Sequence, residues 1–289
     1  MKKTILLLLI ISFAVLSAQT RAIYEYRFRP DSTKVDSLKT EWMYLDITEN
    51  GSKYYSKKAF DNDSIIAAEV KKQMATGSRN ISVSRSGSPS GANFEVEKNY
   101  PNYETHFTSV IDNDTYKYLE DRKLDWKISP EKKKIGEWET QKAETNFAGR
   151  QWEAWFTTEI PFQDGPYKFH SLPGLIVKIA DKTQSHIMEL KAIKPLIIKE
   201  QEELKIEKDI PFMKKKPLTI SRKQYAKQLE QYQKDPVKGM REVLNSGNSK
   251  VRVQVDGNLI SEPKEVLREL ERRAKEDIKN NNNSIELIN

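Results

Sequence analysis

Three residues of the types found in hydrolytic triads, Asp164, His170 and Ser171, lie within eight positions of one another. A serine nucleophile, a histidine base and a carboxylate that orients the base together perform acyl transfer. Adjacent side chains on an extended chain point to opposite faces, however, so His170 and Ser171 are expected to face apart. No G-x-S-x-G turn, which would expose a serine nucleophile, occurs in the chain. We therefore predict no catalytic residues, and a hydrolytic or metal-assisted enzyme stays as the second alternative to the favoured function.

Metal binding has little support in the sequence. The chain has three histidines, His106, His170 and His186, and no cysteine, so thiolate metal sites, cysteine nucleophiles, disulfides and N-terminal lipidation are excluded. No two histidines lie at a spacing typical of metal ligands, and a site would have to assemble from distant strands. Carboxylates that could join the histidines are Glu159, Asp164 and Asp181. We predict no metal and no cofactor.

Residues 165–176 read G-P-Y-K-F-H-S-L-P-G-L-I and separate two predicted strands. Proline fixes φ and glycine permits turns or close backbone contact, so this composition predicts a rigid crossing that plugs an open end of a sheet with apolar side chains. The wall of a ligand cavity is the alternative, and Lys168 and His170 are left for surface roles. The residues that we single out for a structural or binding role are Arg150, Trp152, Trp155, Pro161, Gly165, Pro166, Phe169, His170, Leu172, Pro173, Gly174, Leu175 and Ile176.

The same motif lies in a longer stretch, residues 124–181, that contains L-D-W-K-I, K-I-G-E-W-E-T-Q-K-A and F-A-G-R-Q-W-E-A-W-F-T-T-E-I-P. This stretch resembles the GLPGLI family, exported proteins of Gram-negative bacteria named after the hexapeptide. Ser171 stands where the family name has its first glycine, and it is strained if the backbone there needs a positive φ. Thr140 stands where relatives often have cysteine. The family has no established activity, so the resemblance implies a compartment and a fold but no reaction.

The N-terminus predicts export. Met1, Lys2 and Lys3 form a basic start, residues 5–16 are apolar except for Ser12, and small residues precede Gln19. This pattern is typical of a secretory signal peptide cleaved near Ala18, and the apolar run is shorter than the roughly 20 residues of a membrane span. We expect the mature protein in the periplasm or at the periplasmic face of the outer membrane.

Period-two alternation dominates residues 19–196 and predicts one mainly β domain: an antiparallel curved sheet, sandwich or incomplete barrel. One internal helix is expected over 64–75, a mobile loop over 76–93, and a charged turn at 132–134. Asn50-Gly51 predicts a type I′ hairpin turn. The predicted strands are 22–28, 41–47, 53–60, 94–96, 104–111, 116–119, 124–128, 137–143, 147–157, 175–180 and 187–193.

Residues 197–279 are predicted to be a charged arm, helices and a short strand beside the β domain, and residues 280–289 a disordered tail. Helices are expected over 222–233, 237–244 and 262–279, with a capping box that starts at Ser221 and a cap at Ser261. From Lys191 onward there are 22 Lys and Arg against 16 Asp and Glu, but the signs alternate. Alternation favours solvated helical faces and leaves contact with anionic lipid headgroups open. Because the chain is expected to be exported and has no basic stripe with interleaved aromatic residues, we predict no nucleic-acid partner.

Three functions remain. We favour a non-catalytic accessory factor that binds an envelope protein, with an outer-membrane transporter as one candidate partner. The first alternative is a carrier of an apolar or amphipathic ligand inside a curved sheet. The enzyme is the second.

Overall fold

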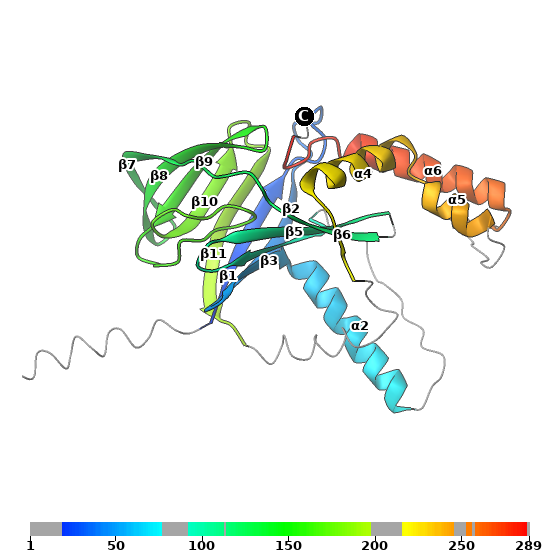
Figure 1. Cartoon of the computed structure of the whole chain (residues 1–289), viewed down its shortest axis with the longest axis horizontal. Coiled ribbons are helices and arrows are strands. Elements are labelled where there is room, and N and C mark those ends of the chain that lie inside the picture. Colours follow the sequence, from blue (N-terminus) through cyan, green and yellow to red (C-terminus); the bar gives the residue numbers. More distant parts are fainter. Residues whose placement is uncertain are drawn as a thin grey trace, which may run out of the picture.

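The structure, a computed structural model, describes residues 19–76, 92–112, 114–197, 216–245, 253–255 and 258–287. The described chain is built on one large, strongly bent β-sheet with helices at its margins (Figure 1). The predicted signal peptide, nearly all of the predicted loop at 76–93 and the charged arm that follows residue 197 lie outside the described residues. None of the described helices is long and apolar enough to cross a membrane.

The sheet has twelve strands in the described residues, and its two end strands do not pair with each other, so it is open rather than a closed barrel. All neighbours are antiparallel except β12 and β6, which are parallel. From edge to edge the order is β12 (Leu218–Thr219), β6 (Asp114–Leu119), β5 (Glu104–Ile111), β4 (Phe94–Asn99), β3 (Gly51–Ser56), β2 (Lys39–Thr48), β1 (Thr20–Phe28), β11 (His186–Pro195), β10 (Leu175–Asp181), β9 (Arg150–Thr157), β8 (Trp138–Phe147) and β7 (Lys127–Ile135). The mainly β prediction is confirmed.

Strand β1, at the centre of the sheet, shows why the sequence folds this way. Its alternate residues Ala22, Tyr24, Tyr26 and Phe28 are buried in the core. Each large apolar side chain that is fully buried stabilises the fold by about 1.5–3 kcal/mol. The hydroxyl of Tyr24 donates to the carbonyl oxygen of Ile176 at 2.6 Å, so this strand also holds residues 165–176.

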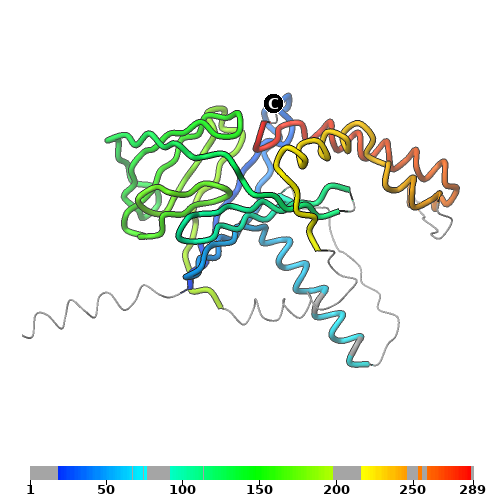
Figure 2. Tube along the Cα trace, in the orientation of Figure 1, coloured from blue at the N-terminus to red at the C-terminus, as the bar shows by residue number. Residues whose placement is uncertain are grey.

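The other face of the sheet carries a buried ion pair. Arg21 donates to Asp46 at 2.6 Å and to the hydroxyl of Tyr55 at 3.0 Å. Helix α2 (Lys57–Ala75) follows β3 directly and contacts this face through Phe60, whose ring lies 6.0 Å from that of Tyr44. The far end of α2 projects away from the sheet (Figure 2).

Three further helices, α4 (Arg222–Lys234), α5 (Lys238–Asn245) and α6 (Pro263–Asn280), follow in the C-terminal region, with a hairpin of β13 (Val253–Val255) and β14 (Asn258–Ile260) between the last two. The predicted capping box is present at Ser221, which accepts from the amide of Gln224. Helix α6 begins differently from the prediction: Glu262 is its N-cap without a side-chain bond, and Pro263 occupies the first turn, where its missing amide costs nothing.

Several boundaries differ from the predicted ones. Residues 132–134 are not a turn but part of edge strand β7, whose lysines face solvent and protect the edge from pairing with other chains. Residues 57–60 belong to α2 rather than to a strand, and residues 124–126 precede β7 without regular structure. Short segments are ambiguous between strand and helix, which explains the error at residues 57–60.

The hairpin between β2 and β3 also differs in detail. Thr48 pairs with Gly51, so the two-residue loop is Glu49 and Asn50 instead of an Asn-Gly turn. Gly51 is needed for another reason: a Cβ atom there would lie 2.2 Å from the carbonyl oxygen of Lys98 on β4. The glycine therefore permits close approach of the neighbouring strand.

Candidate functional site

Residues 158–174, which we call the crossing segment, connect β9 to β10 and fold back on themselves. Asp164 and His170 form an isolated antiparallel bridge, and the amide of Ser171 donates to the carbonyl of Gln163 at 2.9 Å. Tyr167 has a φ of +56°. The amide of Phe169 donates to Pro166 at 3.2 Å. The crossing segment thus satisfies much of its own backbone, as the predicted rigid path requires.

A buried ion pair fastens the crossing segment to strand β4. The Lys98 ammonium and the Asp164 carboxylate are in contact, and both side chains are 0% exposed. Lys98 also donates to the carbonyl of Gly165 at 2.6 Å and to that of Phe169 at 3.3 Å. Asp164 accepts from the hydroxyl of Tyr100 and from the amide of Gly165. Burial lowers the pKa of Lys98, and the charge of Asp164 opposes that change.

His170 and Ser171 are closer together than the sequence predicted. Their Nδ1 and Oγ atoms lie 2.6 Å apart. The expectation that they face opposite sides was wrong, because Ser171 is not extended: its φ is +69°, in the left-handed region. The strain expected if this backbone needs a positive φ is therefore present. The ring of Tyr103 stacks on His170 at 4.8 Å, and the indole of Trp126 donates to the His170 carbonyl at 2.8 Å.

Asp164, the carboxylate of the possible triad, bonds to groups other than His170. Each hydrogen bond described for the Asp164 carboxylate comes from Lys98, Tyr100 or Gly165, and none comes from His170. Burial, followed by the charge of Lys98, lowers the pKa of His170 to about 4, so the ring is neutral at pH 7. His170 and Ser171 form a serine–histidine pair without a described carboxylate to orient the base.

The apolar residues of the motif lie in the core. Leu172, Leu175 and Ile176 are buried, and the ring of Phe169 lies 4.8 Å from that of Trp152. A Cβ atom on Gly174, whose φ is +152°, would lie 1.9 Å from the Thr157 carbonyl oxygen, so only glycine fits at this position.

The other residues singled out from the sequence have different surroundings. Arg150 donates to Asp181 at 3.0 Å and to the Ser284 carbonyl at 2.5 Å. The Trp155 ring is covered by the Lys133 ammonium at 3.5 Å. Pro166 and Gly165 are buried, whereas Pro161 and Pro173 are exposed.

Lys168 is buried, which corrects the prediction of a surface role. Its ammonium donates to Glu120 at 2.7 Å, to Glu286 at 2.5 Å and to the Tyr118 hydroxyl at 2.8 Å. Arg122 donates to both carboxylates, at 2.7 and 2.8 Å. Although burial raises the pKa of Glu120, the bonds from Arg122 and the charge of Lys168 hold it at about 2. Two cations and two anions therefore neutralise one another inside the protein.

Glu286 belongs to a C-terminal segment, residues 281–287, that returns to the sheet (Figure 1). The amide of Asn283 donates to the Pro30 carbonyl, the amide of Leu287 donates to the Ala148 carbonyl, both at 2.9 Å, and Arg150 binds the backbone between them. For these residues the prediction of a disordered tail was wrong. Their bonds join partners more than 100 positions away, which local composition does not reveal.

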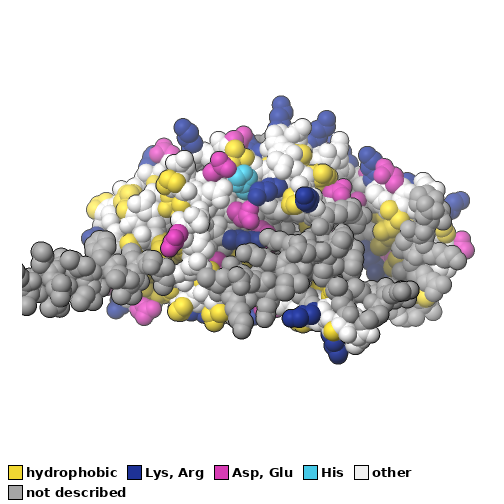
Figure 3. Space-filling model, turned by 60° about the horizontal axis from the view of Figure 1, so that its bottom comes forward, with side chains coloured by type: hydrophobic (Ala, Val, Ile, Leu, Met, Phe, Trp, Pro, Cys, Tyr) yellow, Lys and Arg dark blue, Asp and Glu magenta, His cyan; other side chains and the backbone are white. Residues whose placement is uncertain are grey.

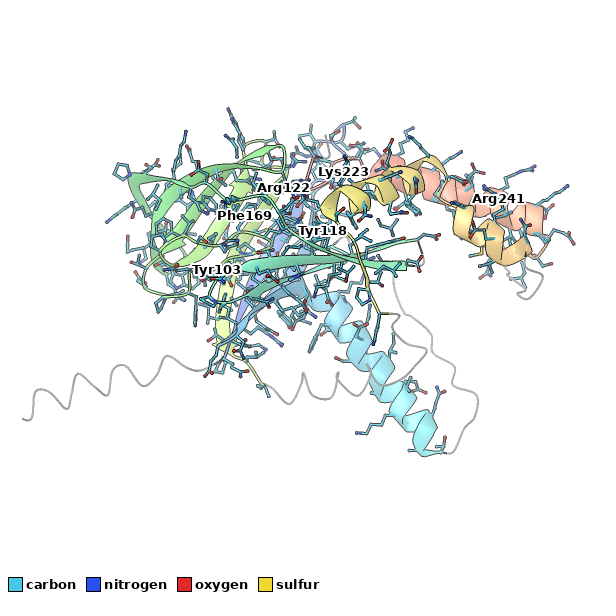
Figure 4. All side chains as sticks on the ribbon, viewed as in Figure 1. Tyr103, Tyr118, Arg122, Phe169, Lys223 and Arg241 are labelled. Atoms are coloured by element: carbon cyan, nitrogen blue, oxygen red, sulfur yellow. The ribbon has the colours of Figure 1, made fainter. Side chains whose placement is uncertain are left out.

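A cavity of about 280 Å³ lies between the sheet, helix α4 and the C-terminal segment. Seven aromatic side chains line it, and we call it the aromatic cavity. The rings are those of Tyr26, Phe28, Phe94, Phe107, Tyr118, Tyr167 and Tyr225. Its other lining residues are Pro30, Asn93, Ser109, His186, Leu229, Asn281, Asn283, Ser284, Ile285 and Glu286. Tyr118 lies near α4, whereas Phe169 lies on the side of β9 and β10 (Figure 4).

Sequence reasoning missed this cavity. None of the residues singled out from the sequence lines it, although Tyr167 of the crossing segment does. Aromatic residues at alternate positions, Tyr26 and Phe28 in β1 and Tyr116 and Tyr118 in β6, were the available signal. A local pattern cannot show that β1, β6 and α4 converge.

The three histidines do not converge either. His106 lies 3.5 Å from Glu104, His186 bonds to Tyr26 through Nδ1 at 2.8 Å, and His170 is in the crossing segment. Among the residues that the structure describes, no three His, Cys, Asp or Glu side chains lie close enough to hold a metal ion.

Comparison with known proteins gives one family. Residues 146–178 match the model described as "Protein of unknown function (Porph_ging)", and this match covers β9, the crossing segment and the start of β10. The name GLPGLI, which the motif suggested, is not the name of the matching model. No curated protein shows significant sequence similarity to the chain.

Among solved structures, PNGF-II is similar in two crystal forms. In the P21 form the TM-score is 0.47 at 15% identity, over 73% of this chain and 33% of the PNGF-II chain. In the C2 form the TM-score is 0.48 at 17% identity, over 73% and 32%. The chain thus spans about a third of the length of PNGF-II.

Proposed function

We propose that this chain is an exported binding protein that holds a small amphipathic molecule in the aromatic cavity. The observation that carries the proposal is the convergence of seven aromatic rings around about 280 Å³ of space. Binding sites for small molecules are concave and mainly apolar, with a few polar groups that fix orientation. An engineered apolar cavity of about 150 Å³ binds benzene, so this volume accommodates a larger ring system.

The rings around the cavity also pack against one another. Phe107 contacts Tyr118 at 5.1 Å and Tyr225 at 5.7 Å, with ring planes inclined to each other. Rings held at such angles present both faces and edges to an occupant, which favours flat apolar molecules. Strands β5 and β6 and helix α4 hold these rings, so the site is built largely on regular elements rather than on loops.

The place of action that we propose is the periplasm or the periplasmic face of the outer membrane, and it rests on the signal-peptide pattern of residues 1–18. Contact with anionic lipids has less support, because Asp and Glu side chains lie among the Lys and Arg side chains on the described part of the surface in Figure 3. The hydrolytic alternative has less support too, because the described contacts of His170 include no carboxylate.

Binding of N-phenyl-1-naphthylamine, a neutral dye that fluoresces in apolar surroundings, tests the proposal. Leu229 lines the cavity from α4, and Leu229→Trp fills part of the space. Gln231→Trp, on the exposed face of the same helix, is the matched control. We expect saturable binding by the wild type and the control, and at least tenfold weaker binding by Leu229→Trp. Absence of saturable binding by the wild type, or equal affinity in all three proteins, contradicts the proposal.

An accessory role with an envelope protein, an outer-membrane transporter among the candidates, is the second proposed function. Helices α5 and α6 extend away from the sheet (Figure 1), and Leu259 in the β13–β14 hairpin that lies between them in the sequence is 61% exposed. A photo-crosslinking residue at position 259 in intact envelopes is expected to capture a discrete partner. The same residue at Ser129, on edge strand β7, is the control. No adduct at 259, or the same adducts at both positions, argues against this role.

A further inference from the structure

The charges beside the aromatic cavity are already used inside the protein. An ammonium group has three N–H donors, and those of Lys168 bond to Glu120, Glu286 and Tyr118. In Glu286, Oε1 accepts from Lys168 and from the Tyr167 hydroxyl, and Oε2 accepts from Arg122. No member of this cluster is left to balance the charge of a ligand.

The remaining polar groups of the cavity are neutral at pH 7. Asn281, Asn283, Ser109 and Ser284 carry no charge. Burial, followed by the charge of Arg150, lowers the pKa of His186 to about 4, so its ring is uncharged as well. A charged ligand would lose its hydration without gaining a counter-ion, which is strongly unfavourable in an apolar site.

His186 offers one unused hydrogen-bonding atom. Its side chain is 1% exposed, and Nδ1 is paired with the Tyr26 hydroxyl at 2.8 Å. Weak hydrogen bonding to the backbone of Asn283 and Ser284 favours the charged form of the ring, yet within the described part of the chain no group makes a hydrogen bond of normal geometry to Nε2. A buried polar atom without a partner is costly and is a recognised mark of a missing one.

We propose that the aromatic cavity takes an uncharged, ring-containing molecule with a hydroxyl group, and that this hydroxyl bonds to Nε2 of His186. This inference rests on the proposed function. Nε2 is a donor or an acceptor depending on the tautomer. A hydroxyl, which both donates and accepts, pairs with either form. The seven rings surround the apolar part of the molecule, and the internal ion pairs exclude charged analogues.

Four ligands that share the naphthalene ring test the need for a hydroxyl group separately from the need for a neutral molecule. They are 2-naphthol, naphthalene, 2-naphthoate and 2-naphthylmethylammonium. Each is titrated into the full chain by calorimetry at pH 7. We expect 2-naphthol to bind at least tenfold more tightly than either ion and about fivefold more tightly than naphthalene. Equal or tighter binding of an ion overturns the uncharged class, and equal binding of naphthalene overturns the hydroxyl contact, while the cavity itself stands. If none of the four binds, the proposed function falls as well.

Two variants, His186→Phe and Leu229→Trp, test whether the preference for 2-naphthol depends on His186 and whether binding occurs in the aromatic cavity. In His186→Phe the preference for 2-naphthol over naphthalene is expected to disappear, whereas His106→Phe, on β5 outside the cavity lining, keeps it. A retained preference in His186→Phe overturns the contact. Leu229→Trp is expected to weaken the binding of 2-naphthol at least tenfold. Unchanged affinity would show that 2-naphthol binds outside the aromatic cavity. The comparison of charged and neutral ligands on the wild type decides the central point even if His186→Phe does not fold.

Discussion

Lys98 of β4 and Asp164 of the crossing segment form an ion pair from which water is fully excluded. The pair joins two halves of the sheet, because β4 lies on one side of β1 and the crossing segment connects β9 and β10 on the other. The carbonyls of Gly165 and Phe169 and the hydroxyl of Tyr100 complete its hydrogen bonds. The residues that resemble a reaction centre in the sequence are thus used to fasten the fold.

Removal of one partner of this pair is expected to destabilise the protein strongly. Lys98→Met leaves the Asp164 carboxylate buried without its cation, which costs about 3–5 kcal/mol. The free energy of unfolding in urea measures the effect. Lys117→Met, which breaks the partly exposed pair with Glu97, is the control and is expected to cost less than about 1 kcal/mol. Similar losses in both variants would show that the buried pair has no special role.

Ser171→Gly is expected to stabilise the protein by about 0.5–1 kcal/mol. A residue with a Cβ atom at a φ of +69° carries about 1–2 kcal/mol of strain, and the greater freedom of glycine in the unfolded chain offsets part of the gain. The melting temperature should rise. Ser129→Gly, in strand β7, should lower it. A lower melting temperature for Ser171→Gly would mean that the contact with His170 outweighs the backbone strain.

Glu286→Gln tests the C-terminal segment. The change removes a charge that Lys168 and Arg122 share, and we expect a loss of about 2–4 kcal/mol in the free energy of unfolding. Glu271→Gln, which breaks an exposed pair with Lys275 on α6, should cost at most about 0.5 kcal/mol. Faster amide exchange at residues 283–287 in Glu286→Gln would confirm that the segment detaches, and unchanged exchange would argue against this anchor.

Stability is expected to fall in mildly acidic solution. The folded-state pKa of His186 is about 4, against about 6.5 in an unfolded chain. Between these values the unfolded chain binds a proton that the folded chain does not. The contribution of the neutral His186 ring to the free energy of unfolding is therefore complete above about pH 6.5 and is lost as pH falls towards about 4. His170, whose pKa is also about 4, adds an effect of the same sign.

Urea unfolding between about pH 8 and about pH 4 measures this dependence. The free energy of unfolding should change less with pH in His186→Gln, because this substitution removes one of the two titrating histidines. An identical slope in the wild type and His186→Gln would contradict the low pKa of His186. Nuclear magnetic resonance titration of the ring gives the same value independently.

How far the sequence predicts this structure depends on the range of the interactions. Strand β1 and helix α4 follow from local alternation and from the capping box at Ser221, so they were predictable. The pairing of Lys98 with Asp164 depends on the order of the strands, which no local pattern contains. His170 and Ser171 were adjacent in the sequence, but their relative orientation depended on one left-handed φ angle.

The aromatic cavity could not be predicted from the sequence for the same reason. Its rings come from β1, β4, β5, β6, α4 and the crossing segment, and each is an ordinary core residue within its own element. Glu286 could not be identified because its partners, Lys168 and Arg122, are more than 100 positions away. The composition of residues 280–289 indicated only a disordered tail.

The position of a bound ring tests the proposed binding site in the aromatic cavity. Nuclear Overhauser effects between 2-naphthol and the protein, recorded on the full chain, identify the side chains that touch the ligand. We expect contacts to the rings of Phe107, Tyr118 and Tyr225 and to His186. Contacts confined to the exposed hairpin or to helix α2, or saturable binding without contacts to these rings, would contradict this expectation.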